Sequence, residues 1–211
     1  MDGPVPYDEF ADCLRELETI NRWTFAYGPT MRWLKRWGST GILWDIGSGG
    51  GDMLRRIRAM LPRWQLTGID INPWAKQAAE VATPSIATIR YQVADIFAMD
   101  DAARADVIIS ALFTHHLSDA TVIAFLRWME QHAISGWFIN DLHRHPVPYY
   151  FIRMATGVGS RNRLIRHDAA VSVARAFTRT DWQRLLAEAG ITQGVRIRWH
   201  FPFRYSVGRV K

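Results

Sequence analysis

Apolar and polar positions follow two different periodic patterns along the chain, and together these patterns predict strands that alternate with helices. Short apolar runs that end in polar residues are typical of buried strands, whereas stretches with a period near 3.6 are typical of amphipathic helices. Strands are expected at 42–46, 65–71, 88–95, 105–110 and 136–142, and helices at 52–61, 73–82 and 118–133. This alternation implies right-handed crossovers and an α/β fold with a doubly wound, largely parallel sheet.

The two ends of the chain depart from this alternation. Residues 7–37 read as helices interrupted at Gly28-Pro29. Near the other end, 178–190 reads as a helix with Thr180 as its cap and Gly190 as its terminator. It is followed by strands at 191–201 and 203–210, which Pro202 separates as in a hairpin. We therefore expect an N-terminal helical cap over 1–40 and one larger domain over 41–211, with a lid-like insertion at about 144–176.

Composition narrows the class of protein. The chain has 211 residues, and 48% of them are hydrophobic, which suffices for one sizeable core. Its single cysteine, Cys13, excludes a disulfide framework and a cysteine-based zinc site. The acidic start MDGPVPYDEF does not resemble a signal peptide, and no apolar run approaches the roughly 20 residues that span a bilayer. These features predict a cytoplasmic protein.

Charge is distributed unevenly along the chain. Residues 1–141 carry a balance of −4, whereas residues 142–211 carry +10, within a total net charge of +6. A basic segment of this kind is typical of partners such as nucleic acid, a membrane surface or an anionic small substrate, and an arginine-rich solvated surface explains it equally well.

A glycine-rich loop, GSGGG, follows the first expected strand and its final acid, Asp45. Glycine lets the main chain approach a ligand closely, and open α/β sheets bind ligands at this edge. No lysine follows Gly51, so the loop is not a P-loop, and Asp52 stands where a dinucleotide fingerprint needs its third glycine. Because Asp52 also places a negative charge at the start of a helix, the loop favours a cationic or zwitterionic ligand over a phosphate.

Two further acids end later strands. Asp70 closes the second strand, where a carboxylate can accept both hydroxyls of a ribose, and Asp95 closes the third, in reach of a base. With the acid-x-Gly-x-Gly-x-Gly pattern of Asp45, Gly47, Gly49 and Gly51, this order resembles the class I S-adenosylmethionine-dependent methyltransferases.

The resemblance covers about residues 41–211 and implies a Rossmann-like, seven-stranded sheet with an antiparallel last strand. It implies S-adenosylmethionine as cofactor, with the methionyl part in the glycine loop, the ribose at Asp70 and the adenine amine at Asp95. The cofactor-binding residues that it implies are Asp45, Gly47, Ser48, Gly49, Gly51, Asp70, Ile71, Asp95, Ile96 and Ser110.

The loop after the fourth strand reads SALFTHHL and narrows the acceptor by exclusion. It lacks the Asn/Asp-Pro-Pro-aromatic loop of enzymes that methylate base amines, and it lacks the paired glutamates of arginine methyltransferases. Methylation of pyrimidine C5 uses a cysteine nucleophile, and Cys13 lies far upstream of this loop. The stretches LTGIDINPWA, INDLHRHPVPYY and IRHDAAVSVARAFT resemble a bacterial small-molecule branch related to the ubiquinone-biosynthesis O-methyltransferases. The resemblance implies a small hydroxylated aromatic, quinol or polyketide-type acceptor.

O-methylation calls for a base, since a phenol with a pKa of about 10 is a poor nucleophile at neutral pH. Histidine suits this role, and His116, His143 and His145 follow the fourth and fifth strands. We predict that these three act in catalysis. Contacts to the substrate are predicted for His115, Arg144, Tyr149, Arg166 and His167. No metal site is predicted, because the Asp/Asn ligand set of magnesium-dependent catechol enzymes is not evident.

The arginines of the lid-like segment would attract an anionic aromatic acceptor and orient it through paired hydrogen bonds. Three alternatives remain open at this point. The enzyme could methylate carbon in an activated aromatic or enol, it could act on RNA through its basic last third, or it could bind the cofactor without transferring a methyl group.

Overall fold

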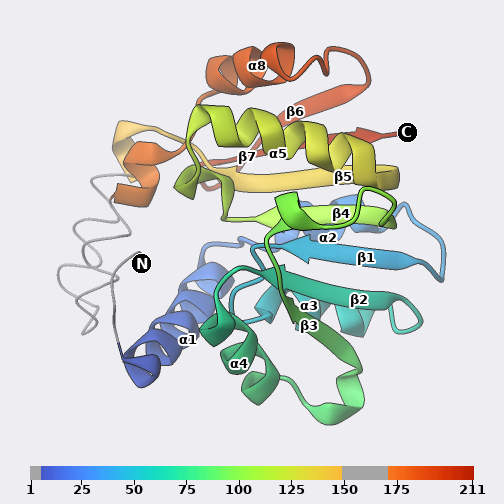
Figure 1. Cartoon of the computed structure of the whole chain (residues 1–211). Coiled ribbons are helices and arrows are strands. Elements are labelled where there is room, and N and C mark those ends of the chain that lie inside the picture. Colours follow the sequence, from blue (N-terminus) through green and yellow to red (C-terminus); the bar gives the residue numbers. More distant parts are fainter. Residues whose placement is uncertain (1–5, 149–170) are drawn as a thin grey trace.

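The computed structural model describes residues 6–148 and 171–211, and its centre is a single seven-stranded sheet (Figure 1). The strand order is β3-β2-β1-β4-β5-β7-β6. The strands are β1 (Ile42–Ile46), β2 (Gln65–Asp70), β3 (Ile89–Val93), β4 (Ala105–Ala111), β5 (Ala133–Leu142), β6 (Val195–His200) and β7 (Arg204–Val210). All neighbouring pairs are parallel except those of β7, which runs antiparallel to β5 and to β6. The predicted Rossmann-like, mostly parallel sheet with an antiparallel last strand is confirmed.

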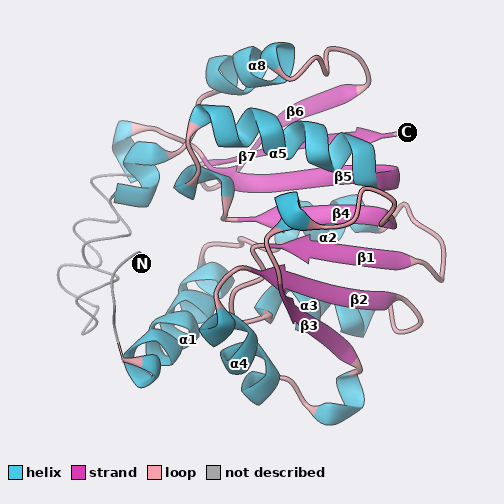
Figure 2. Cartoon of the chain, viewed as in Figure 1, coloured by secondary structure: helices cyan, strands magenta, loops and turns pink. Residues whose placement is uncertain are grey.

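Helices cover both faces of this sheet (Figure 2). They are α1 (Tyr7–Trp23), α2 (Gly28–Leu34), α3 (Asp52–Met60), α4 (Pro73–Ala82), α5 (Asp119–His132) and α8 (Arg179–Glu188), with 3-10 turns η1 (Ser85–Ala87), η2 (Ile96–Ala98) and η3 (Thr114–His116). Helices α5 and α8 pack into one apolar core, and α2 and α3 pack into a second core on the opposite face. Burial on both sides explains why the strands read as nearly continuous apolar runs.

The helix ends follow local capping chemistry. Asn72 accepts a hydrogen bond from the main-chain N–H of Trp74 at the start of α4, with Pro73 at the first helical position. The side chain of Ser118 caps α5 by accepting a hydrogen bond from the main-chain N–H of Thr121. The predicted cap of α8 was wrong: Thr178, two residues before Thr180, is hydrogen-bonded to the N–H of Asp181 in a capping box.

The N-terminal helices pack against the larger domain. The ring of Trp33 on α2 stacks on Phe138 of β5, with centroids 4.9 Å apart. Leu14 of α1 is the nearest side chain above Gly49 and Gly50, so α1 lies over the glycine loop. The division at residue 40 stays a prediction, and most of the expected lid-like insertion lies outside the described residues.

Within residues 6–148 and 171–211, no helix combines the length and the apolar character needed to cross a membrane.

Candidate active site

The glycine loop joins β1 to α3 through left-handed backbone. Gly47, Gly49 and Gly51 have φ values of +70°, +50° and +73°, which non-glycine residues rarely adopt. A Cβ on Gly47 would lie 2.5 Å from Cδ2 of Phe113, so the aromatic ring that follows β4 requires this glycine. The N–H of Gly47 donates to the carbonyl of Ile69 at 2.9 Å, which fixes the loop against the end of β2.

Asp70 fastens the same loop through its carboxylate. Oδ2 accepts the main-chain N–H of Gly49 at 2.9 Å, and Oδ1 accepts that of Asn72 at 3.0 Å. Burial raises the pKa of Asp70, and these hydrogen bonds oppose the shift. Carboxylate oxygens offer about four acceptor sites, so capacity remains for ribose hydroxyls.

Asp45 is a buried acid without a compensating cation. It is 2% exposed, and none of the described residues forms a hydrogen bond or ion pair with its carboxylate. Burial, and next the charges of Asp52 and Asp70, raise the pKa of Asp45 well above its ordinary value. Such a group is stabilised by a positively charged ligand. The donor set around this loop therefore fits the sulfonium or ammonium part of S-adenosylmethionine.

The remaining residues that were predicted to bind the cofactor differ in what they contact. Ser110 is buried and donates its hydroxyl to the carbonyl of Ile46 at 2.9 Å, so it ties β4 to β1. Asp95 is exposed and accepts the N–H of Phe97 at 3.0 Å, which makes it the cap of η2. Ile71 is 69% exposed at the end of β2, whereas Ile96 is buried. Ser48 is buried inside the loop.

His115 and Asp141 form a buried pair at the ends of β4 and β5. Nδ1 of His115 lies 2.7 Å from Oδ1 of Asp141. Oδ2 of Asp141 also accepts the hydroxyl of Thr114 and, at 3.0 Å, the main-chain N–H of His115, while the N–H of Leu142 donates to Oδ1 at 2.7 Å. Burial would raise the pKa of Asp141, but the charge of His115 and these hydrogen bonds outweigh it and lower the pKa. Because a carboxylate only accepts, Nδ1 of His115 is the nitrogen that donates to Asp141, which leaves Nε2 as the other ring nitrogen.

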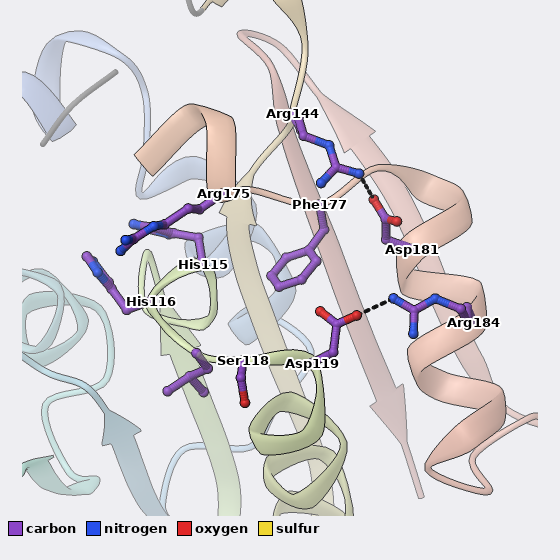
Figure 3. Close-up of a pocket in the computed structure, with 10 residues that line it drawn as sticks. His115, His116, Ser118, Asp119, Arg144, Arg175, Phe177, Asp181 and Arg184 are labelled. Atoms are coloured by element: carbon purple, nitrogen blue, oxygen red, sulfur yellow. Dashed lines mark hydrogen bonds and ion pairs between the residues drawn. The ribbon is translucent and has the colours of Figure 1, made fainter. Parts of the chain in front are cut away.

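A cavity of about 390 Å³ opens beside this pair (Figure 3). Its lining comes from η3, the start of α5, the segment after β5 and the first turns of α8. The lining residues are His115, His116, Leu117, Ser118, Asp119, Arg144, Arg175, Phe177, Asp181 and Arg184.

Charges around the cavity are mostly paired. Arg144 lies 2.6 Å from Asp181, and Arg184 lies 2.5 Å from Asp119. Arg175 points toward the two histidines in Figure 3, and no ion pair joins it to an acid among the described residues. The cavity therefore presents one uncompensated guanidinium beside His115 and His116, whose rings are 4.2 Å apart.

His143 and His145 lie elsewhere. Neither lines the cavity; the ring of His143 packs edge-on against Tyr205 at 4.7 Å, and that of His145 stacks on Phe203 at 5.2 Å. Burial, and then the neighbouring His145, lower the pKa of His143. The structure thus separates these two histidines from the His115–His116 pair.

Three predicted substrate residues, Tyr149, Arg166 and His167, lie outside the described residues, as do Arg153, Arg161 and Arg163. The part of the chain that is described brings no three His, Cys, Asp or Glu side chains together as a metal site. Metal independence stays a prediction.

Sequence reasoning missed Asp141, although a signal for it was present. Asp45, Asp70 and Asp95 were each singled out because an acid ends an apolar strand, and INDL ends the fifth strand in the same way. Arg175 and Phe177 were missed because they reach the cavity from a part of the chain more than 50 residues beyond His116.

Comparison with known proteins agrees with this geometry. Residues 43–136 match the model of a methyltransferase domain family. No curated protein sequence matches the chain. Among solved structures, human N-acetylserotonin methyltransferase bound to S-adenosylmethionine superposes with a TM-score of 0.66 at 16% identity, over 98% of this chain. This chain spans 56% of that protein's length.

Two further structures are similar along most of their own length. The plantazolicin methyltransferase BpumL, with a triazolic analogue and S-adenosylhomocysteine, gives a TM-score of 0.65 at 18% identity, over 98% of this chain and 86% of its own. An S-adenosylmethionine-dependent methyltransferase from Aquifex aeolicus gives 0.64 at 15% identity, over 94% and 97%. Residues 43–136 thus match a methyltransferase domain, and the chain shares its fold with methyltransferases solved with S-adenosylmethionine or S-adenosylhomocysteine.

Proposed function

We propose that the enzyme methylates a hydroxyl group of a small aromatic, quinol or polyketide-type acceptor bound in the cavity beside His115. The observation that carries this proposal is the His115–Asp141 pair, which borders that cavity at the carboxyl edge of the sheet. A cavity of about 390 Å³ falls in the range of small-molecule sites, roughly 300–1,000 Å³. The motifs INDLHRHPVPYY and IRHDAAVSVARAFT support the bacterial small-molecule branch related to ubiquinone-biosynthesis O-methyltransferases.

In this proposal the cofactor supplies an electrophilic methyl group on a sulfonium. The glycine loop holds it through main-chain groups, Asp70 through its carboxylate, and Asp45 lies where a positive charge is favoured. Nε2 of His115 accepts the acceptor's hydroxyl proton as the oxygen attacks, and Asp141 stabilises the imidazolium that forms. His116 borders the same cavity and is the second candidate for this proton. His143 and His145 would then affect turnover only through their packing against the β6–β7 turn.

An anionic acceptor suits the charge of the cavity. Arg175 has no acidic partner among the described residues, so its guanidinium is available for a carboxylate or an enolate. N-acetylserotonin methyltransferase and a putative O-methyltransferase from Nostoc punctiforme share the fold, which supports a small acceptor.

The test is formation of S-adenosylhomocysteine with a panel of hydroxylated aromatics, with the product examined by NMR. His115→Asn keeps a hydrogen bond to Asp141 but removes the base, and we expect turnover to fall at least ~100-fold with the cofactor Kd unchanged. His132→Asn is the matched control, since His132 is buried on α5 with Nδ1 2.7 Å from the carbonyl of Ala103. A methyl group on carbon, or full turnover in His115→Asn, would contradict the proposal.

A further inference from the structure

A second hollow of about 650 Å³ lies away from the candidate active site, between α2 and the edge strand β6. Its floor is the face of β5 and β7 that α2 leaves uncovered, on the side of the sheet opposite α5 (Figure 1). We call it the arginine groove. Its lining is Pro29, Arg32, Trp33, Arg36, Phe138, Gly194, Val195, Arg196, Arg198, His200, Ser206, Gly208 and Val210.

The arginine groove is basic on both walls. Arg32 and Arg36 contribute from the side of α2, and Arg196 and Arg198 from alternate positions of β6, whose side chains share one face. The lining contains no Asp or Glu, and none of these four guanidiniums has an ion pair in the described part of the chain.

The positive charges are close enough to oppose one another. Burial, and then the charges of Arg196 and Arg198, lower the pKa of Arg36. Burial, and then Arg32 and Arg198, lower the pKa of His200. Like charges held together without a counter-charge cost free energy, which a bound anion would relieve.

A buried guanidinium lies on the strand beside the groove, although it is not part of the lining. Arg204 is the cross-strand neighbour of His200, and its side chain is 4% exposed. Within the described part of the chain, its Nη2 donates to Thr24, while its Nε and Nη1 have no hydrogen-bond partner. Burial lowers the pKa of Arg204 to about 10, which leaves it charged at neutral pH.

We propose that the arginine groove binds a small soluble anion that carries two or more phosphate groups. Guanidiniums on two facing walls can each form paired hydrogen bonds with a tetrahedral phosphate, whose oxygens point in several directions. The volume suits a small molecule. An extended polyanion is disfavoured, because residues 1–141 without Arg32 and Arg36 of the groove hold 11 Lys/Arg against 17 Asp/Glu, a balance of −6.

The experiment is calorimetric titration of the full chain with tripolyphosphate. Arg196→Gln/Arg198→Gln and Arg32→Gln/Arg36→Gln should each weaken binding at least ~10-fold, because charge-assisted hydrogen bonds are lost. Arg63→Gln/Arg90→Gln removes the same charge from exposed sites outside the groove and should change binding less than ~2-fold. Unchanged S-adenosylhomocysteine affinity shows that each variant is folded.

Four results would overturn the proposal. The first is that tripolyphosphate does not bind the wild type. The second is that the control variant loses as much affinity as the groove variants. The third is that citrate or orthophosphate binds as tightly as tripolyphosphate. The fourth is a single-stranded oligonucleotide that binds more tightly as it lengthens, which would make the groove a nucleic-acid surface.

Discussion

The two halves of the sheet's carboxyl edge differ in composition: one is formed mainly by main-chain groups and the other mainly by side chains. Beyond β1 and β2 lies the half that we propose for the cofactor, called the cofactor half. It is formed largely by main chain, with left-handed glycines whose N–H groups are fixed by Ile69 and Asp70. Beyond β4 and β5 lies the half that we propose for the acceptor, called the acceptor half. It is formed by side chains, with the His115–Asp141 pair at its base and charged residues of α5 and α8 around it.

This difference follows from what each half must recognise. Main-chain groups are present in every sequence, so a loop conformation can hold the same cofactor with few fixed side chains. An acceptor is distinguished by side-chain shape and charge, which change with single substitutions. Substitutions in the two halves should therefore separate cofactor affinity from turnover.

The largest effect is expected in the acceptor half, from Asp141→Ala. Loss of the carboxylate leaves the buried His115 and Thr114 without their partner, and we expect about 3–5 kcal/mol of destabilisation by chemical denaturation. Because the pKa of Asp141 is lowered in the folded state, its contribution is full above its unfolded pKa and is lost as the pH falls through the folded value. The gap between wild type and variant should close in acid; a constant gap would contradict the ionised pair.

The second-largest effect is expected in the cofactor half, from Gly47→Ala. The new Cβ meets Phe113 in a left-handed backbone, and we expect a loss of about 2–4 kcal/mol of stability, with cofactor affinity reduced at least ~10-fold. Gly190→Ala is the matched control, since Gly190 has a φ of +79° and a methyl group added there would meet no atom within 4 Å. It should lose about 1–2 kcal/mol and keep full cofactor affinity in calorimetry.

A smaller effect is expected from Asp45→Asn, which removes the charge of the side chain but keeps its shape. The raised pKa means that Asp45 destabilises the ligand-free fold above its unfolded pKa, so Asp45→Asn should be more stable at pH 7, with the gain vanishing in acid. The same variant should weaken the binding of S-adenosylmethionine, a sulfonium, more than the binding of S-adenosylhomocysteine, a neutral thioether. The difference between the two losses of binding free energy should be about 1 kcal/mol. Equal losses for both ligands would place the positive charge elsewhere.

The smallest effect is expected for Asp95→Ala. Asp95 is exposed and caps the short turn η2, so we expect less than about 1 kcal/mol of destabilisation and a Kd raised ~2–5-fold. A larger change in Kd would show a stronger contact with the adenine than this geometry supports.

The sequence located the strand ends and the glycine loop better than it located the residues around the cavity, for a physical reason. Asp45, Gly47 and Asp70 follow directly from strand ends and a local turn, which apolar patterning locates. The same patterning placed the hairpin correctly, and the family resemblance implied the antiparallel β7 that the structure shows. It placed the cap of α8 two residues too late, because Thr178 and Thr180 both lie near the start of the helix and only the bond to Asp181 decides between them.

The acceptor half depends on distant contacts that no local pattern encodes. His115 meets Asp141 across a strand pairing, and Arg175 reaches the same cavity from beyond the fifth strand. His143 was predicted in catalysis from its position in the chain; its ring packs against Tyr205, and its catalytic role stays a prediction.

The central claim is tested most directly by a crystal structure with S-adenosylhomocysteine and a hydroxylated acceptor. We predict the homocysteine part along residues 47–51, the ribose hydroxyls within hydrogen-bond distance of Asp70, and the acceptor oxygen facing Nε2 of His115. A cofactor bound away from the glycine loop, or an acceptor outside the His115 cavity, would contradict the account.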